Sequence, residues 1–301
     1  MVGTDEEKKM RELLILPFDH RGSFQEKLFG IKDRLPTETE SKNISHAKQT
    51  IYQGFLWALE HGADRTKAGI LVDEQFGSDI LQSAQKLGIT TACPVEKSGQ
   101  DTFDFEYGEN FAAHIEKVAP TFVKVLVRLN PTCNNDDQLK RLLRLDTYCK
   151  NAGRLFMFEL LVPATNEQKS ADYDTRLRPS LMVQAISTIQ NAGIEPDVWK
   201  LEGIESSEDA VRVSNQARSN NRDHVGVIVL GRGENAAKVR TWLTTAARIP
   251  GIIGFAVGRT VFWEPLVGIK NGSLTEAQAI EQIGRNYLDL CSLWTKEKVR
   301  Y

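Results

Sequence analysis

The chain has 301 residues, 41% of them hydrophobic and 26% charged, which is typical of a globular protein with one sizeable domain or two small ones. Its 38 Lys and Arg against 40 Asp and Glu give a formal charge of -2, which argues against electrostatic attraction to nucleic acid or to an anionic membrane surface. No apolar run approaches the roughly 20 residues of a membrane span. The first ten residues are polar and of mixed charge, unlike a secretory signal, so we expect a cytoplasmic protein.

Cysteine usage agrees with that expectation. The four cysteines are far apart and form no CxxC motif or Cys/His ligand spacing, so neither a disulfide framework nor a structural zinc site is expected.

Short apolar, β-branched segments predict eight strands. Each has about four to eight residues and is apolar on both faces, as in a parallel sheet covered by helices. The predicted strands are residues 12–18, 68–72, 90–93, 122–127, 154–161, 197–201, 225–230 and 252–257.

Amphipathic stretches between these segments predict helices, several of which end at a glycine suited to the left-handed C-cap conformation. The segment 30–43, which contains Pro36, predicts an elaborated loop after the first strand. The predicted helices are residues 45–60, 78–87, 110–118, 136–152, 179–192, 207–218, 235–247 and 275–293.

This order of elements predicts a (β/α)8 TIM barrel that forms a single domain over residues 1–301. The alternative is an open, doubly wound sheet. Against it, no GxGxxG motif follows the first strand, and eight strands are many for one open sheet.

Three charged residues interrupt the predicted core strands: Lys124 in the fourth, Glu159 in the fifth and Lys200 in the sixth. A buried charge is costly unless it is paired or its pKa shifts. Any one of them alone would be a structural ion pair as readily as a functional group. Three on neighbouring strands that face one barrel lumen favour an active site.

These residue types suit carbonyl chemistry. Two amines close together disfavour double protonation, which would leave one neutral and able to form an imine with a ketone. A carboxyl group such as that of Glu159 would move the protons that imine formation requires. The alternative that remains open is non-covalent catalysis by Lys124, Glu159 and Lys200.

Glycine-rich loops follow the seventh and eighth strands, where barrels often bind phosphate through backbone N–H groups. Gly231, Arg232 and Gly233 form the first loop, and Gly258 and Arg259 the second. Arg259 would add a charge-assisted contact. The pair of loops predicts a substrate with a phosphate at one end, although such glycines also occur in ordinary tight turns.

Other polar residues at strand ends are candidate substrate ligands. His20 would bind substrate, act as a base or cap a loop, and Arg128, Arg21 or Arg232 would face a substrate carboxylate. Asp73 and Glu74 resemble part of a divalent metal site, but no histidine set converges on them, so no metal and no cofactor is expected.

Several of these phrases occur in the same order in Schiff-base aldolases of the tagatose-bisphosphate aldolase type, which the chain resembles from Asp19 to Arg259. The closer resemblance is to the aldolase-like domain fused to 5-dehydro-2-deoxygluconokinases in inositol catabolism. The phrases are FDHRGS at 18–23, VKVL at 123–126, FEL at 158–160, VWKLE at 198–202 and GFAVGR at 254–259.

The resemblance implies that Lys200 is the Schiff-base lysine, Lys124 a partner ammonium and Glu159 the acid/base group. Asp19 would orient hydroxyls or assist proton transfer. It also implies a metal-free aldolase whose substrate is a phosphorylated sugar, with 6-phospho-5-dehydro-2-deoxygluconate as the best candidate and dihydroxyacetone phosphate and malonate semialdehyde as products. His20 stands where tagatose-type enzymes have Gln, which argues against tagatose 1,6-bisphosphate.

Two readings compete with an aldolase: a phosphate-binding barrel isomerase or decarboxylase, and a barrel that only senses sugar phosphates. The kinase half of the fusion is absent from this sequence, so we expect a separate polypeptide to supply that activity. Self-association into a homo-oligomer is expected from the size of the barrel, without a surface stripe that identifies the interface.

Overall fold

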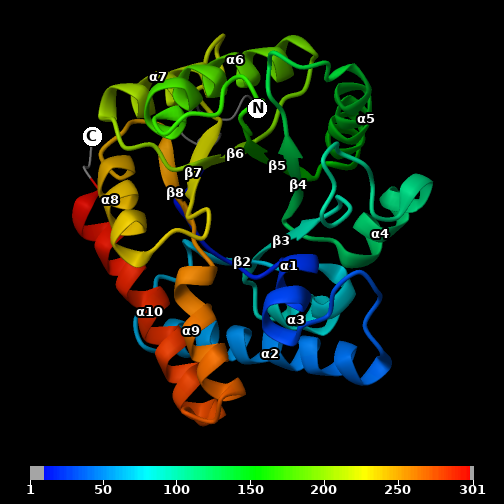
Figure 1. Ribbon diagram of the computed structural model, residues 1–301, viewed down its shortest axis with the longest axis vertical. Helices are drawn as coiled ribbons and strands as arrows, with labels where there is room; N and C mark the ends of the chain where they lie inside the picture. The colour runs from blue at the N-terminus through cyan, green and yellow to red at the C-terminus, as the bar shows by residue number, and fades with distance from the viewer. Residues whose placement is uncertain (1–9, 299–301) are drawn as a thin grey trace, which may run out of the picture.

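Eight parallel strands close into a barrel in the computed structural model, which describes residues 10–298. The strands follow one another around the barrel in chain order, and β8 pairs with β1 to close it. Helices surround the strands (Figure 1). The strands are β1 (Leu13–Pro17), β2 (Ala68–Leu71), β3 (Thr90–Pro94), β4 (Phe122–Arg128), β5 (Leu155–Leu161), β6 (Val198–Glu202), β7 (Gly226–Leu230) and β8 (Ile252–Ala256).

The predicted (β/α)8 barrel is therefore confirmed, with each predicted strand within two residues of an observed one. A short helix α1 (Gly22–Phe24) and the π-helix η1 (Gln25–Phe29) follow β1, and two further short helices are the 3-10 helix η2 (Gly108–Asn110) and the π-helix η3 (Tyr173–Leu177). The longer helices are α2 (Glu38–Glu60), α3 (Glu74–Lys86), α4 (Phe111–Val118), α5 (Asp136–Ala152), α6 (Arg178–Asn191), α7 (Ser207–Ala217), α8 (Ala236–Ala246), α9 (Arg259–Lys270) and α10 (Glu276–Glu297).

Two helical segments differ most from the prediction. Part of the loop predicted at 30–43 is helix, because Thr37 and Glu40 form a capping box that starts α2 at Glu38. Helix α9 was absent from the predicted set, and it contains Pro265, a residue that normally interrupts a helix. Within residues 10–298, no helix combines the length and apolarity that crossing a membrane requires.

The barrel lumen is filled in layers that alternate along each strand. Side chains two residues apart point to the same face of a strand, so Phe122 and Lys124 of β4 both face inward, as do Met157 and Glu159 of β5. The lower layer is apolar and seals the bottom of the barrel. Its buried residues are Leu13, Ile15, Leu71, Ala92, Phe122, Met157, Val198, Ile228 and Ala256. The polar layer above it therefore rests on a closed apolar floor.

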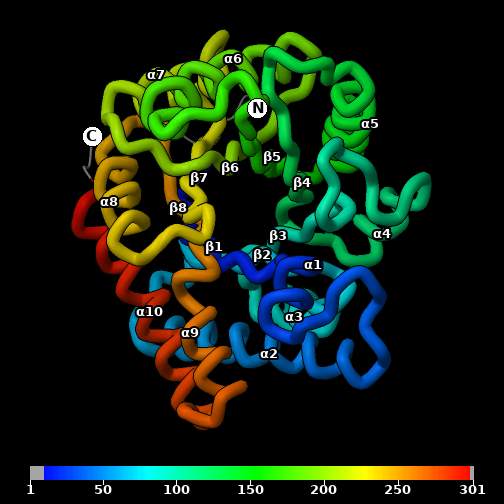
Figure 2. Tube along the Cα trace, viewed as in Figure 1, coloured from blue at the N-terminus to red at the C-terminus, as the bar shows by residue number. Residues whose placement is uncertain are grey.

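A second, larger core lies between the barrel and its ring of helices. Helix α10 packs tightly against α2 because glycines face bulky side chains: Gly54 lies against Ile283, and Gly284 against Trp57. Helices α2, α9 and α10 lie together on one side of the barrel (Figure 2).

Barrel closure supplies a test of this packing. Gly254 of β8 pairs with Leu13 of β1, and a Cβ atom at Gly254 would lie 1.7 Å from the Leu13 carbonyl oxygen. We expect Gly254→Ala to destabilise the protein by at least about 2 kcal/mol, because the clash is with backbone rather than with a movable side chain. The midpoint of urea unfolding measures the effect. Gly22→Ala is the control, since its Cβ would meet only Ser98 Oγ at 3.4 Å; equal midpoints for the two variants would contradict the prediction.

Candidate active site

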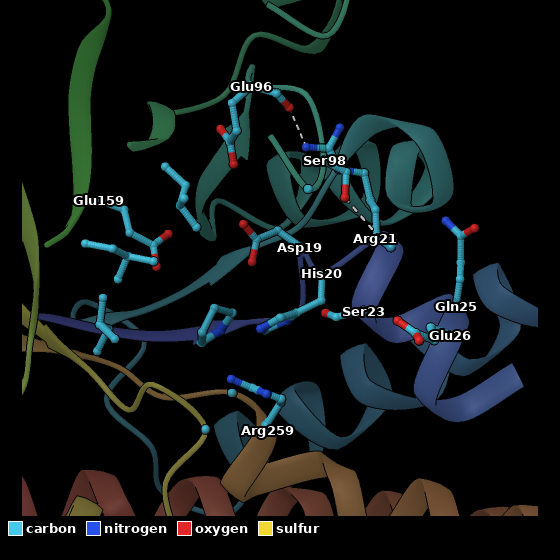
Figure 3. Close-up of a pocket in the computed structure, with 18 of the residues that line it drawn as sticks. Asp19, His20, Arg21, Ser23, Gln25, Glu26, Glu96, Ser98, Glu159 and Arg259 are labelled. Carbon is cyan, nitrogen blue, oxygen red and sulfur yellow. Dashed lines mark hydrogen bonds between the residues drawn. The ribbon is translucent and has the colours of Figure 1, made fainter. Parts of the chain in front are cut away.

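The carboxyl ends of the strands open into a cavity of about 810 Å³. The loops after β1, β3, β7 and β8 form its walls, and inward side chains of β4, β5 and β6 form its base. In Figure 3, Asp19, His20, Glu96, Glu159 and Arg259 gather around one space, whereas Glu26 lies toward the outside. All of the site residues proposed from the sequence line this cavity, and Glu96 joins them.

Glu159 lies between two lysines at the base of the cavity. Its Oε1 is 2.7 Å from Lys200 Nζ, and its Oε2 is 2.8 Å from Lys124 Nζ. The strand register explains this, because Glu159 of β5 pairs with Lys200 of β6 and lies two residues above the β5 partner of Lys124. All three side chains are less than 10% exposed.

Lys124 contacts two further carboxylates. Its Nζ lies 2.9 Å from Asp19 Oδ2, after β1, and 2.8 Å from Glu96 Oε1, after β3. Sequence reasoning missed Glu96, although it follows a predicted strand by three residues. The signal that could have identified Glu96 is a carboxylate close to the end of an apolar strand. The predicted strand ended at residue 93, whereas β3 continues through Pro94, so Glu96 lies closer to the strand end than the prediction placed it.

The carboxylates change the electrostatic expectation for the two amines. Burial opposes charge on Lys124, but Asp19, Glu159 and Glu96 together raise its pKa well above the ordinary value. The three carboxylates therefore favour the protonated ammonium form of Lys124. Burial alone would raise the pKa of Asp19 and Glu159, yet Lys124 and then Lys200 outweigh it, and both pKa values are lowered.

His20 is held neutral beside this cluster. Burial lowers its pKa to about 4, Asp19 opposes the shift, and Arg259 and Lys200 add to it. Its Nδ1 is buried and has no hydrogen-bond partner among the described residues. A neutral imidazole donates from one ring nitrogen and accepts at the other, so His20 is able to bind a hydroxyl.

The loops after β7 and β8 meet through Arg259. Its Nη2 donates to the Arg232 carbonyl oxygen at 2.9 Å, and its guanidinium covers Gly233, where a Cβ would lie 2.1 Å from that nitrogen. A Cβ at Gly258 would lie 2.0 Å from the Pro17 carbonyl oxygen, so that position requires glycine. Gly233 has a φ of +77°, a left-handed conformation that favours glycine. At Gly231 the nearest contact would be 3.4 Å, so packing does not demand glycine there. Burial lowers the pKa of Arg259, and no carboxylate opposes it.

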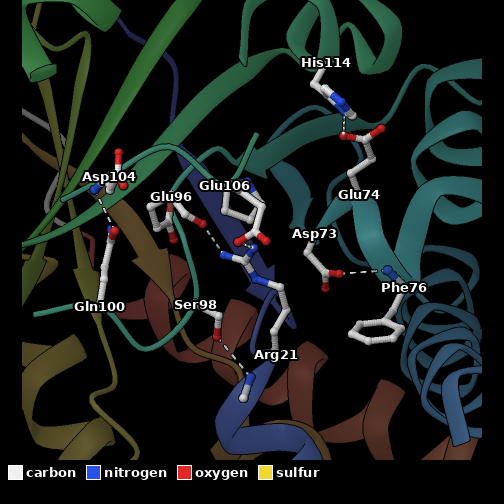
Figure 4. A network of polar contacts seen from close by, with 12 residues as sticks. Arg21, Asp73, Glu74, Phe76, Glu96, Ser98, Gln100, Asp104, Glu106 and His114 are labelled. Carbon is white, nitrogen blue, oxygen red and sulfur yellow. Dashed lines mark hydrogen bonds and ion pairs between the residues drawn. The ribbon is translucent and has the colours of Figure 1, made fainter. Parts of the chain in front are cut away.

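Two of the three arginines expected to face a substrate carboxylate have carboxylate partners of their own. Arg21 contacts Glu106 at 2.8 Å and the Glu96 carbonyl oxygen at 2.5 Å (Figure 4). Arg232 contacts Asp174 at 2.7 Å and Glu202 at 3.1 Å. These contacts occupy both guanidinium groups and hold the loops in place, so neither arginine is free for a carboxylate of the substrate.

Arg128 differs from those two arginines. It donates to the Gln100 carbonyl oxygen at 2.5 Å and forms no ion pair among the described residues. It lies at the carboxyl end of β4, in the cavity wall. Among the described residues, Arg128 and Arg259 are thus the lining arginines without a carboxylate partner.

Asp73 and Glu74 have structural partners. Asp73 caps α3 through the Phe76 N–H and pairs with Lys48, which is fully buried in α2. Glu74 contacts His114 at 2.8 Å, as Figure 4 shows. Within residues 10–298 no set of three or more His, Cys, Asp or Glu side chains is arranged to hold a metal. The Lys48 pair could not be predicted from the sequence, because a lysine within an amphipathic helix normally faces solvent.

Several solved structures share this architecture. The fructose-bisphosphate aldolase of Plasmodium falciparum aligns with 98% of this chain and 94% of its own, with a TM-score of 0.68 and 12% identity. The fructose-bisphosphate aldolase of Slackia heliotrinireducens aligns with 91% and 86%, with a TM-score of 0.57 and 12% identity. The Cgl0159 protein of Corynebacterium glutamicum aligns with 93% and 90%, with a TM-score of 0.56 and 19% identity. At these identities the likeness shows an aldolase-like barrel fold.

The chain belongs to the family described as "Uncharacterized protein conserved in bacteria (DUF2090)", which matches residues 2–298. No curated protein matches it in sequence.

The charge cluster generates a stability prediction. Lys124→Met removes the cation shared by three buried carboxylates, so we expect a loss of about 3–5 kcal/mol at pH 8. The uncompensated carboxyl groups would then have raised pKa values and take up protons as the pH falls, so the loss relative to the wild type should shrink between pH 8 and pH 5. Urea unfolding at several pH values measures both effects.

Lys97→Met is the matched control, because Lys97 pairs with Asp104 where both are about half exposed. We expect it to cost at most about 1 kcal/mol at either pH. A Lys124→Met loss that stays constant with pH would mean that the three carboxylates do not share the charge of Lys124.

Proposed function

We propose that this protein is a class I aldolase that cleaves a phosphorylated keto-acid sugar through an imine on Lys200. The observation that carries the proposal is the carboxylate of Glu159 shared between Lys200 and Lys124 in a buried layer of the barrel. A nucleophilic amine, a proton carrier and a fixed ammonium are the groups that ketone capture requires. The aldolase-like fold agrees with this chemistry and does not by itself establish it.

Imine formation follows from the positions of these groups. The Lys200 amine attacks the ketone carbon after it gives a proton to Glu159, 2.7 Å away. The resulting carbinolamine loses water when Glu159 returns a proton to the departing oxygen. Lys124 stays protonated through these steps because of its carboxylate neighbours, and it stabilises negative charge that develops on substrate oxygens.

Substrate orientation follows from the two arginines without carboxylate partners. Arg259 with Gly231, Gly233 and Gly258 would hold the phosphate on the β7–β8 side. Arg128 would bind an anionic group on the β4 side, with the reacting carbons between the two. A single guanidinium suits a carboxylate, which it binds through two parallel hydrogen bonds.

The substrate with this pattern, and the one that the family resemblance implies, is 6-phospho-5-dehydro-2-deoxygluconate. Its ketone lies next to the phosphorylated carbon, and its carboxylate lies at the other end. Cleavage between the third and fourth carbons would release malonate semialdehyde and leave dihydroxyacetone phosphate bound as the enamine of Lys200. A ketose bisphosphate would instead need a second phosphate site at Arg128.

The imine itself is testable. Borohydride added together with dihydroxyacetone phosphate should reduce the imine to a stable adduct on Lys200, which peptide mass spectrometry would locate. Lys200→Met should give no adduct and no cleavage. Lys97→Met should keep both, because Lys97 lines the same cavity but its ammonium group pairs with Asp104, away from the Glu159 cluster. Turnover without an adduct would indicate the non-covalent isomerase or decarboxylase. Binding without turnover would indicate a sensor.

Substitutions of Arg128 and Arg259 should weaken binding of different parts of the substrate. Arg128→Ala should raise KM for 6-phospho-5-dehydro-2-deoxygluconate by about 10- to 100-fold, because a charged hydrogen bond contributes about 1.5–3 kcal/mol. It should leave the Kd of dihydroxyacetone phosphate unchanged, since that half carries no carboxylate. Arg259→Ala should weaken both ligands. Equal effects of Arg128→Ala on the two ligands would contradict this assignment of the ends.

A further inference from the structure

Glu96 has a carboxylate oxygen that the protein leaves without a partner. Its Oε1 accepts from Lys124 Nζ at 2.8 Å, while Oε2 is buried and has no hydrogen-bond partner among the described residues. Glu96 is 5% exposed and lines the cavity. A buried carboxylate oxygen needs a donor, and the space beside it is the one that the substrate would enter.

The backbone fixes Glu96 firmly. The Val95 N–H donates to the Lys124 carbonyl oxygen at 3.0 Å, which ties the segment to β4. Glu96 also forms an antiparallel bridge with Phe105, and Arg21 donates to its carbonyl oxygen. Figure 3 shows that this carbonyl faces Arg21 while the side chain extends toward Asp19. The carboxyl group is therefore pre-positioned, as catalytic groups must be.

The three carboxyl groups around Lys124 differ in their ability to accept a proton. Both oxygens of Glu159 contact lysines and its pKa is lowered, so it exchanges a proton with Lys200, which it contacts directly, rather than with a more distant hydroxyl. The pKa of Asp19 is also lowered, so it is a weak base. Burial raises the pKa of Glu96, with Lys124 and Arg21 opposing the shift. Glu96 is thus the strongest base of the three and has a free oxygen.

The order of strands places Glu96 on the appropriate side of the imine. Lys200 is on β6, Lys124 on β4, and Glu96 follows β3, so the three lie in sequence around the lumen. A substrate whose phosphate lies at the β7–β8 loops extends from the imine carbon toward Lys124 and Glu96. Its first hydroxyls beyond the imine therefore approach this end of the cavity.

We propose that Glu96 is the catalytic base that takes the proton from the substrate hydroxyl on the carbon released as the aldehyde. This assignment rests on the aldolase function proposed above. The O–H bond breaks and its electron pair forms the aldehyde C=O. The adjacent C–C bond breaks, and its electron pair moves into the protonated imine to give a neutral enamine on Lys200. The proton stays on Glu96 Oε2 until the aldehyde leaves, then passes to solvent at the mouth of the cavity, and the enamine carbon takes up one proton in return.

Glu96→Gln tests this assignment, because the amide oxygen still accepts from Lys124 while the base is lost. We expect kcat for cleavage to fall by about 10²- to 10³-fold, the range of general base catalysis. Exchange of the α-hydrogen of dihydroxyacetone phosphate in D2O, and its borohydride adduct, should persist at wild-type levels, since neither step deprotonates that hydroxyl. In the wild type, kcat should fall as the pH drops through the raised pKa of Glu96, and the variant should lack this acid limb.

Two control variants test whether the loss of cleavage is specific to the carboxylate of Glu96. Glu26→Gln changes a cavity carboxylate that is about half exposed and that pairs with Lys32 at 3.6 Å, so this variant should cleave normally. Glu96→Asp, which keeps a carboxylate, should cleave faster than Glu96→Gln.

Wild-type cleavage rates in Glu96→Gln would overturn the role of Glu96 and leave the aldolase proposal intact. The same conclusion would follow if Asp19→Asn lost cleavage while Glu96→Gln kept it. Loss of exchange and adduct together with cleavage in a folded Glu96→Gln protein would also overturn the role, because the residue would then act before bond cleavage. Absence of any adduct in the wild type would instead reject the imine mechanism itself.

Discussion

The shared carboxylate of Glu159 is the interaction on which the site depends. Two lysines on β4 and β6 point into one lumen, and without a bridging anion their charges would repel in a poorly solvated space. Glu159 on the strand between them meets both ammonium groups with separate oxygens, so one carboxylate fixes the position of two amines. A closed parallel barrel makes this possible because successive strands present side chains at nearly the same height.

The fold was predictable from the sequence because barrel strands carry a strong local signal. Each is short, apolar on both faces and separated from the next by a helical period, so their number and order follow from hydrophobic pattern alone. The misses occurred where local and tertiary preferences conflict. Pro265 concealed α9 because proline disfavours a helix interior, and the capping box at Thr37 lies in a segment whose proline and charges resemble a loop.

Site residues were predictable where a charged residue interrupts an otherwise apolar strand. Lys124, Glu159 and Lys200 interrupt apolar strands, and a charge in such a place is conspicuous in one sequence. The ion pairs were not predictable, because the charges that neutralise one another are set by distances in three dimensions. Arg21 and Arg232 resembled free anion ligands until Glu106, Glu202 and Asp174 proved to be their partners. Glu96 follows a strand, a common place for a carboxylate, and only the contact with Lys124 distinguishes it.

The charge pattern of the cavity constrains its ligand independently of any family. Asp19, Glu96 and Glu159 outnumber Lys124 and Lys200, so the centre is slightly acidic and favours hydroxyl groups or a cationic intermediate. The arginines without carboxylate partners stand apart from this centre, Arg259 at the start of α9 and Arg128 at the end of β4. A ligand that is anionic at both ends and rich in hydroxyls between them would satisfy every one of these groups. A protonated imine at Lys200 would also be stabilised by the acidic centre, because its positive charge replaces that of the ammonium group from which it forms.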